Sequence, residues 1–76
     1  MIRELERVVL LASVPEEGLE AGDVGTVVHA YPAGRAFEVE FLMLDGKTAA
    51  VATVEAKNVR PASDHEITHA RELVTR

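Results

Sequence analysis

Hydrophobic and polar residues alternate most regularly between positions 36 and 43. Phe37, Val39 and Phe41 occupy every second position there, and a glutamate stands between each pair. A period of two places the three apolar side chains on one face of a β-strand and the glutamates on the other. We therefore predict a strand over 36–43 that turns one face to a core and the other to water.

Four further strands are expected around this one. Asp45-Gly46 is the strongest hairpin turn signal in the chain and connects the strand to the next one. The polar residues 55–58 are typical of a single helical turn before the last strand. Apolar and β-branched runs predict the four strands over residues 7–12, 24–31, 47–54 and 59–60.

Two glycines mark the entry to the second of these strands. Gly22 suits the left-handed backbone of a tight turn, and Gly25, inside an apolar run, suits a bulge or the close approach of a neighbouring strand. Asp23 between them is expected to accept hydrogen bonds from turn amides. The turn does not have the Gly-rich fingerprint of a phosphate-binding loop, in which Lys and Ser/Thr follow the last glycine, so we interpret it as structural.

Five short strands with a long first loop and a helical turn before the last strand predict a mainly β fold. The best geometric match is a small SH3-like barrel over residues 1–61. A five-stranded barrel of the oligonucleotide-binding type is the alternative, but the segment is short for it. Residues 62–76 are expected to form a C-terminal helix or tail.

The pattern changes after Ala62. Ser63 and Glu66 have the spacing of a capping box, and the following apolar residues recur at helical intervals. We predict an amphipathic helix over Asp64–Val74. A helix this short is marginal alone in water, so its apolar face is expected to dock on the barrel, on a second copy or on another protein. Its apolar positions are Ile67, Ala70, Leu73 and Val74.

Composition narrows the class of protein. A chain of 76 residues is expected to form one domain, and its apolar content of 47% is mostly aliphatic, with only 4% aromatic residues. It has no cysteine, so disulfides and thiolate metal sites are excluded. No apolar run approaches the roughly 18 residues that a membrane span needs, and no export signal is evident. We expect a cytoplasmic protein.

Negative charge is concentrated near the N-terminus. The formal net charge is -5, and residues 1–23 hold six acids and two bases, a net charge of -4. An acidic surface repels phosphate backbones and attracts basic partners. The bases outside that segment are scattered, which disfavours nucleic-acid binding. They include Arg35, Lys47, Lys57 and Arg60.

No group of residues predicts catalysis. His65 and His69 lie four apart and would share a helix face, but no third ligand completes a zinc motif, so we predict solvated side chains and no metal. His29 is expected to pair across a hairpin with Glu38 or Glu40. The chain has neither a cysteine nucleophile nor a Gly-x-Ser-x-Gly elbow, and little room for a cleft. We predict a protein that is not an enzyme and has no cofactor.

Several of these segments together resemble a bacterial family known as domain of unknown function 4926. The resemblance covers about residues 3–61 and implies short, mostly stand-alone proteins with an SH3-like shape and no catalytic residues. Some members are encoded beside another small protein, which implies a two-protein module of the toxin–antitoxin kind. The matching residues are Leu5, Val8, Val9, Pro15, Gly18-Leu19, Gly22 to Val28, Tyr31, Phe37 to Phe41, Asp45-Gly46 and Val59-Arg60-Pro61.

The leading functional hypothesis is a non-catalytic protein-binding module that engages its partner through the acidic loop and the tail, with an antitoxin-like role as its specific form. The first alternative is a KOW-like binder of RNA or a ribonucleoprotein, because the turn from Gly22 to Val27 resembles the turn of that class. The second alternative is a structural homo-oligomer. The candidate partner-binding residues are Glu16, Glu17, Leu19, Glu20, Asp23, Ile67 and Leu73.

Overall fold

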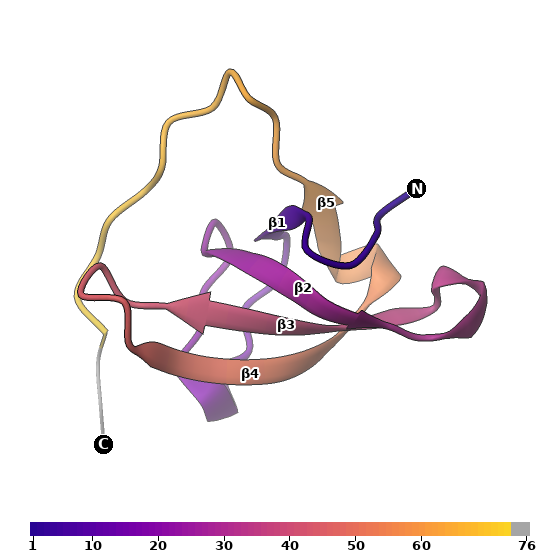
Figure 1. Ribbon diagram of the computed structural model, residues 1–76. Helices are drawn as coiled ribbons and strands as arrows, with labels where there is room; N and C mark the ends of the chain where they lie inside the picture. Colours follow the sequence, from indigo (N-terminus) through magenta and orange to yellow (C-terminus); the bar gives the residue numbers. More distant parts are fainter. Residues whose placement is uncertain (74–76) are drawn as a thin grey trace.

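The computed structural model describes residues 1–73, which form one sheet of five antiparallel strands (Figure 1). The strand order is β4-β3-β2-β1-β5, so the first four strands form a meander and the last returns beside the first. The strands are β1 (Arg7–Leu10), β2 (Val24–Ala30), β3 (Ala36–Leu42), β4 (Thr48–Glu55) and β5 (Val59–Pro61). Three short 3-10 turns connect them: η1 (Pro15–Glu17), η2 (Pro32–Gly34) and η3 (Ala56–Asn58).

The prediction of a mainly β chain with five strands is confirmed. Each predicted strand is present, with ends that differ by one or two residues, and a 3-10 turn precedes β5 where a helical turn was expected. The alternation in β3 also has the predicted orientation, since Phe37, Val39 and Phe41 are buried. Sequence periodicity thus located the sheet.

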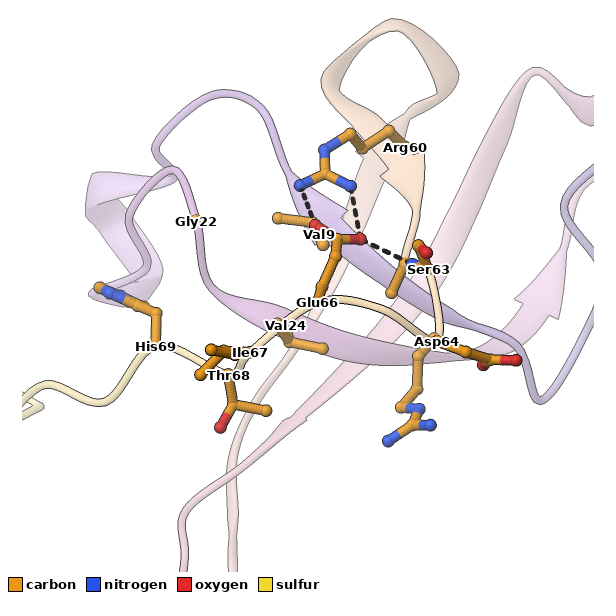
Figure 2. Close-up of a pocket in the computed structure, with 12 residues that line it drawn as sticks. Val9, Gly22, Val24, Arg60, Ser63, Asp64, Glu66, Ile67, Thr68 and His69 are labelled. Atoms are coloured by element: carbon orange, nitrogen blue, oxygen red, sulfur yellow. Dashed lines mark hydrogen bonds and ion pairs between the residues drawn. The ribbon is translucent and has the colours of Figure 1, made fainter.

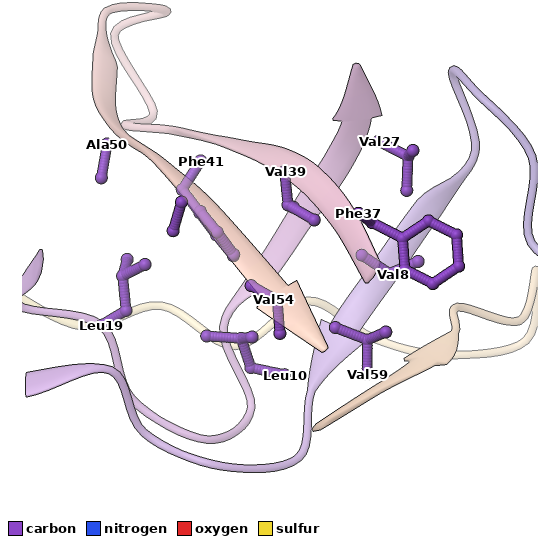
Figure 3. Close-up of a cluster of buried hydrophobic side chains, with 11 residues drawn as sticks. Val8, Leu10, Leu19, Val27, Phe37, Val39, Phe41, Ala50, Val54 and Val59 are labelled. Carbon is purple, nitrogen blue, oxygen red and sulfur yellow. The ribbon is translucent and has the colours of Figure 1, made fainter. Parts of the chain in front are cut away.

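The core is a single aliphatic cluster with two aromatic rings (Figure 3). The β3 side chains Val39 and Phe41 lie opposite the small residues Ala52 and Ala50 of β4 in the strand register, so large and small side chains alternate across the pair. This complementarity explains the alanine-rich sequence of β4. The most deeply buried side chains are Leu10, Val8, Val27 and Val39.

Gly25 in β2 lies where the sheet leaves no space for a side chain. A Cβ atom there would lie 2.5 Å from Val39 Cγ1, 2.8 Å from Phe41 Cε2 and 2.9 Å from the carbonyl oxygen of Glu40. Distances this short are not tolerated between carbon atoms, and one of the three neighbours is backbone. Glycine is therefore required for β2 and β3 to approach each other.

The predicted C-terminal helix is wrong for residues 64–73, which contain a single turn at Asp64 and His65 and otherwise form neither helix nor strand. The expected capping contact forms, because the Ser63 N–H donates to Glu66 Oε1 at 2.6 Å. The helix does not continue beyond it. Its presumed apolar face does not dock as a unit, since Ile67 is 95% exposed whereas Leu73 is half-buried. Val74, the last residue of the prediction, lies outside the described residues.

Candidate functional site

The site begins with the long loop between β1 and β2. Leu19 inserts into the core, and a bridge between Val14 and Leu19 closes the loop on itself. Gly18 ends η1 in the left-handed conformation, with φ 73°. These contacts fix the loop backbone, so that the carbonyl oxygen of Gly18 has a defined position.

Asp23 stands at the end of this loop and is held by its backbone. Its N–H donates to the carbonyl oxygen of Glu20 at 3.0 Å, and its Oδ2 accepts the Glu20 N–H at 2.9 Å. The turn is tied to β1, because Leu10 donates to the carbonyl oxygen of Asp23 and accepts from the Gly22 N–H. Gly22 has φ 97°, a conformation that favours glycine. The carboxylate is only 12% exposed.

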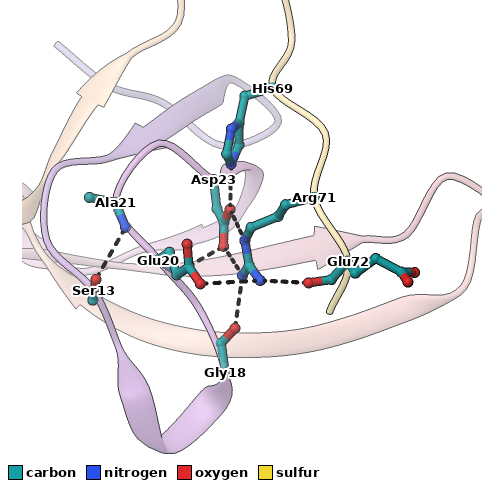
Figure 4. Close-up of polar contacts among 8 residues, drawn as sticks. All are labelled: Ser13, Gly18, Glu20, Ala21, Asp23, His69, Arg71 and Glu72. Atoms are coloured by element: carbon teal, nitrogen blue, oxygen red, sulfur yellow. Dashed lines mark hydrogen bonds and ion pairs between the residues drawn. The ribbon is translucent and has the colours of Figure 1, made fainter. Parts of the chain in front are cut away.

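The tail brings Arg71 onto this carboxylate (Figure 4). Arg71 Nε donates to Asp23 Oδ1 at 2.9 Å, and Nη2 donates to Asp23 Oδ2 at 2.6 Å and to the carbonyl oxygen of Gly18 at 2.8 Å. Glu20 Oε2 lies 3.6 Å from Nη1. The arginine side chain is 18% exposed. We call the Gly18 carbonyl and the Glu20 and Asp23 carboxylates the arginine cradle.

The electrostatics of the cradle favour an ionised carboxylate. Burial raises the pKa of Asp23, but hydrogen bonds from the Arg71 guanidinium and the Glu20 N–H, together with the positive charge of Arg71, outweigh it. The pKa of Asp23 is therefore below its ordinary value. His69 adds a further contact, with Nε2 at 3.4 Å from Asp23 Oδ1.

A groove of about 450 Å³ adjoins the cradle. One wall is the end of β3 and its connection to β4, where Leu42 and Met43 are exposed and Leu44 is 98% exposed. The tail forms the opposite side, and Leu73 is half-buried in the groove. Among the residues that line its apolar part are Leu19, Phe41, Leu42, Met43, Leu44, Ala49 and Leu73.

A second hollow, of about 350 Å³, lies under the first half of the tail (Figure 2). Arg60 of β5 donates from Nη1 and Nη2 to the two carboxylate oxygens of Glu66, at 2.9 and 2.6 Å. These hydrogen bonds, with that from the Ser63 N–H, lower the pKa of Glu66 to about 2. The tail is therefore attached at two places, at Glu66 and at the arginine cradle.

The structure separates the predicted partner-binding residues into groups. Leu19 is buried in the core and has almost no surface to offer a partner. Glu16 and Glu17 are exposed on η1, and Ile67 is exposed on the tail. Glu20 and Asp23 belong to the arginine cradle, and Leu73 lines the adjoining groove.

Sequence analysis missed the residue that organises the site, Arg71. In the structure Arg71 and Leu73 are half-buried, and Glu72 between them is exposed. The sequence alone does not indicate that Arg71 returns to Asp23, because the apolar residues of this segment recur at helical intervals and predict a helix instead.

The other histidines have ordinary surroundings. His29 lies opposite Glu38 in the strand register, but its Nδ1 is 3.5 Å from Glu4 and its ring packs edge-on against Tyr31. Glu38 instead accepts hydrogen bonds from Thr53 and Tyr31, which lower the pKa of Glu38. The hydrogen bond to Glu38 in turn raises the pKa of Tyr31.

Within residues 1–73 no three His, Cys, Asp or Glu side chains are grouped to hold a metal ion. The same residues include no helix that is long and apolar enough to cross a membrane.

Comparison with protein families gives one match. The model of the family described as "Domain of unknown function (DUF4926)" matches residues 4–61. The chain belongs to this family. Searches among curated proteins and among solved structures found no match.

The family match divides the site. The loop that carries Gly18 and Asp23 lies inside the matched residues, whereas Arg71 lies beyond them. The DUF4926 region thus supplies the cradle and one wall of the groove. The group that occupies the cradle comes from outside that region.

Proposed function

We propose that this member of the DUF4926 family is a non-catalytic protein-binding module built on an SH3-like barrel. The strand order, in which β5 returns to β1, supports the barrel assignment, as do the long first loop and the 3-10 turn between β4 and β5. Barrels of this kind carry binding surfaces in their loops, on a rigid scaffold.

One observation carries the proposal: a stretch of protein chain without helix or strand lies against the arginine cradle and forms one side of the adjoining groove. Residues 68–73 make up this side, and Arg71 and Leu73 are half-buried against the body of the protein. A surface that accepts a protein segment in cis has the shape and polarity to accept one in trans. The exposed tip at Leu44 supplies apolar area beside it.

The distribution of charge favours a protein over RNA as the partner. Arg60 is paired with Glu66, and Lys57 Nζ lies 3.8 Å from Glu55, so two of the scattered bases are beside carboxylates. The net charge of -5 opposes the approach of a phosphate backbone. An acidic loop beside an apolar tip suits a basic, partly apolar protein segment instead.

An antitoxin-like role is the specific form of this proposal, with the product of the neighbouring gene as the partner. The test is co-expression of the full chain with that product, followed by co-purification through a tag on this chain. Leu44→Asp places a charge on the groove wall, and Val51→Asp places one on an exposed position of β4 as the matched control. We expect the partner to co-purify with the wild-type chain and with Val51→Asp, and at least about tenfold less with Leu44→Asp.

A neighbour that never co-purifies with the wild-type chain contradicts the antitoxin-like role. Equal recovery with Leu44→Asp contradicts the assignment of the groove as the interface. The alternatives have their own signatures: the RNA hypothesis requires binding at low salt that falls steeply as salt rises, and the homo-oligomer requires sedimentation as more than one copy.

A further inference from the structure

The two groups of the arginine cradle that accept hydrogen bonds from Arg71 are also held by contacts that do not involve the tail. Gly18 is positioned by η1 and by the core anchor Leu19, and Asp23 is positioned by Glu20 and by hydrogen bonds to β1. All these contacts are made within the β1–β2 loop and its strands. The tail therefore enters a preformed site, which keeps the entropic cost of binding low.

The cradle fits the shape of a guanidinium group. Asp23 accepts side-on from Nε and Nη2, and the Gly18 carbonyl oxygen accepts from Nη2 in addition. Such a bidentate arrangement requires the planar fork of arginine, and a lysine ammonium does not reproduce it. The partial burial of Asp23 strengthens these bonds relative to an exposed ion pair.

The neighbouring groove adds a second recognition element at fixed spacing. Side chains two apart in an extended chain point to the same side, and Leu73 follows Arg71 by two residues. Leu73 lines the groove with Met43 and Leu44, whereas the intervening Glu72 is exposed. The surface thus contacts an arginine and, two residues later in the same segment, an apolar side chain.

The segment that now fills the site is attached sparsely. Between the ion pair of Glu66 and the contacts of His69 and Arg71, Ile67 is 95% exposed, and residues 66–73 contain no helix or strand. Figure 1 shows the chain after β5 arching away from the sheet and this stretch returning toward the β3–β4 connection. Few buried contacts mean that the stretch can open without disturbing the core.

We propose, on the basis of the binding function above, that the groove recognises an extended Arg-x-Leu segment of a partner protein, and that the chain's own tail occupies the site as a competitor. The partner's arginine takes the place of Arg71 on Asp23 and Gly18, and its apolar residue takes the place of Leu73. The tail must leave before the partner enters.

The competition has a measurable consequence. A ligand that binds only the open form has an apparent Kd raised by the inverse of the open fraction. Removing Arg71 from the tail raises that fraction while leaving the cradle intact. A peptide ligand should therefore bind the Arg71→Ala chain more tightly than the wild-type chain.

The test uses the full chain and a capped peptide with the sequence of residues 66–73, EITHAREL, followed by NMR titration. We expect the peptide to bind Arg71→Ala at least about tenfold more tightly than wild type. Arg35→Ala, which removes an arginine from the opposite end of the sheet, is the matched control and should behave as wild type. Peptides with lysine in place of arginine, or with serine in place of leucine, should bind the Arg71→Ala chain at least about tenfold more weakly than the original peptide does.

Three results overturn the inference: no peptide binding to Arg71→Ala, equal affinity for Arg71→Ala and wild type, or equal binding of the lysine peptide. Asp23→Asn in the Arg71→Ala chain should abolish binding. Because that change also touches the loop, Glu20→Gln is a milder second variant that should weaken binding. If the peptide fails while the neighbouring gene product still co-purifies through Leu44, the inference fails and the proposed function stands.

Discussion

Gly25 shows how one residue can be fixed by backbone packing alone. Its place in β2 is buried, and the atoms that exclude a side chain include both a core valine and a carbonyl oxygen of β3. The side chain could move, but the carbonyl is part of the sheet ladder. A substitution here consequently strains the pairing of β2 with β3.

We predict that Gly25→Ala lowers the free energy of unfolding by about 1 to 3 kcal/mol, at the upper end because one contact is to backbone. Gly46→Ala is the control, since Gly46 has φ 89° but open space around it, and should cost about 1 kcal/mol. Urea denaturation followed by circular dichroism measures both. A cost at Gly25 no greater than at Gly46 contradicts the packing account.

The local contacts of Asp23 follow from the sequence, whereas its long-range partner does not. The sequence predicts that Asp23 accepts hydrogen bonds from turn amides, and it does accept the Glu20 N–H. Its arginine partner is 48 residues away in the chain, and no local pattern indicates which cation returns to it. Long-range ion pairs of this kind depend on the path of the whole tail, which the sequence pattern misassigned.

Among the elements, the strands were predictable and the tail was not. Strand positions follow from burial on one face, which alternation records directly. The tail has no buried stripe to record, and its two attachments are polar contacts to Arg60 and to the arginine cradle. A weak helical period in such a segment has no packing to support a helix. The ion pairs of Glu66 and Arg71 instead hold the segment in a non-helical conformation.

The first attachment gives a prediction for Glu66. The pKa of this carboxyl should be about 2, because it accepts hydrogen bonds from Arg60 and from the Ser63 N–H. NMR titration of the side-chain carboxyl carbon should show this midpoint. In Arg60→Gln the pKa should rise toward the ordinary value of 4.5, whereas in Lys57→Gln it should stay low. An unchanged pKa in Arg60→Gln would show that the pair does not persist in solution.

For the whole molecule, the strap formed by residues 62–73 links the last strand to the first loop. It joins β5 at one end and the arginine cradle at the other, so the last strand and the first loop are connected through polar contacts as well as through the core. Its contribution to stability therefore depends on ionisation, whereas that of the core does not.

We predict that the strap's contribution falls at acidic pH. The pKa of Asp23 is lowered from 3.8 in the folded chain, so its share of the stability is present above pH 3.8 and is lost as the pH falls through the lowered pKa. At pH 7, Arg71→Ala should reduce the free energy of unfolding by about 1 kcal/mol, and the difference from wild type should shrink below pH 3.8. Denaturation across pH tests this, with Arg35→Ala as the control that should track wild type. A difference that persists unchanged at the acidic end refutes the link to Asp23.

The contact between Arg71 and the arginine cradle also affects how the chain unfolds under mechanical force. A force that draws the chain from its C-terminal side reaches the contact between Arg71 and Asp23 before it reaches β5, which joins β1 through only three paired residues. We therefore expect unfolding from that end in two stages, in which the contact between Arg71 and Asp23 breaks first and β5 separates from β1 afterwards. In that order of events, a polar contact at the surface breaks under tension before the hydrophobic interior is disrupted.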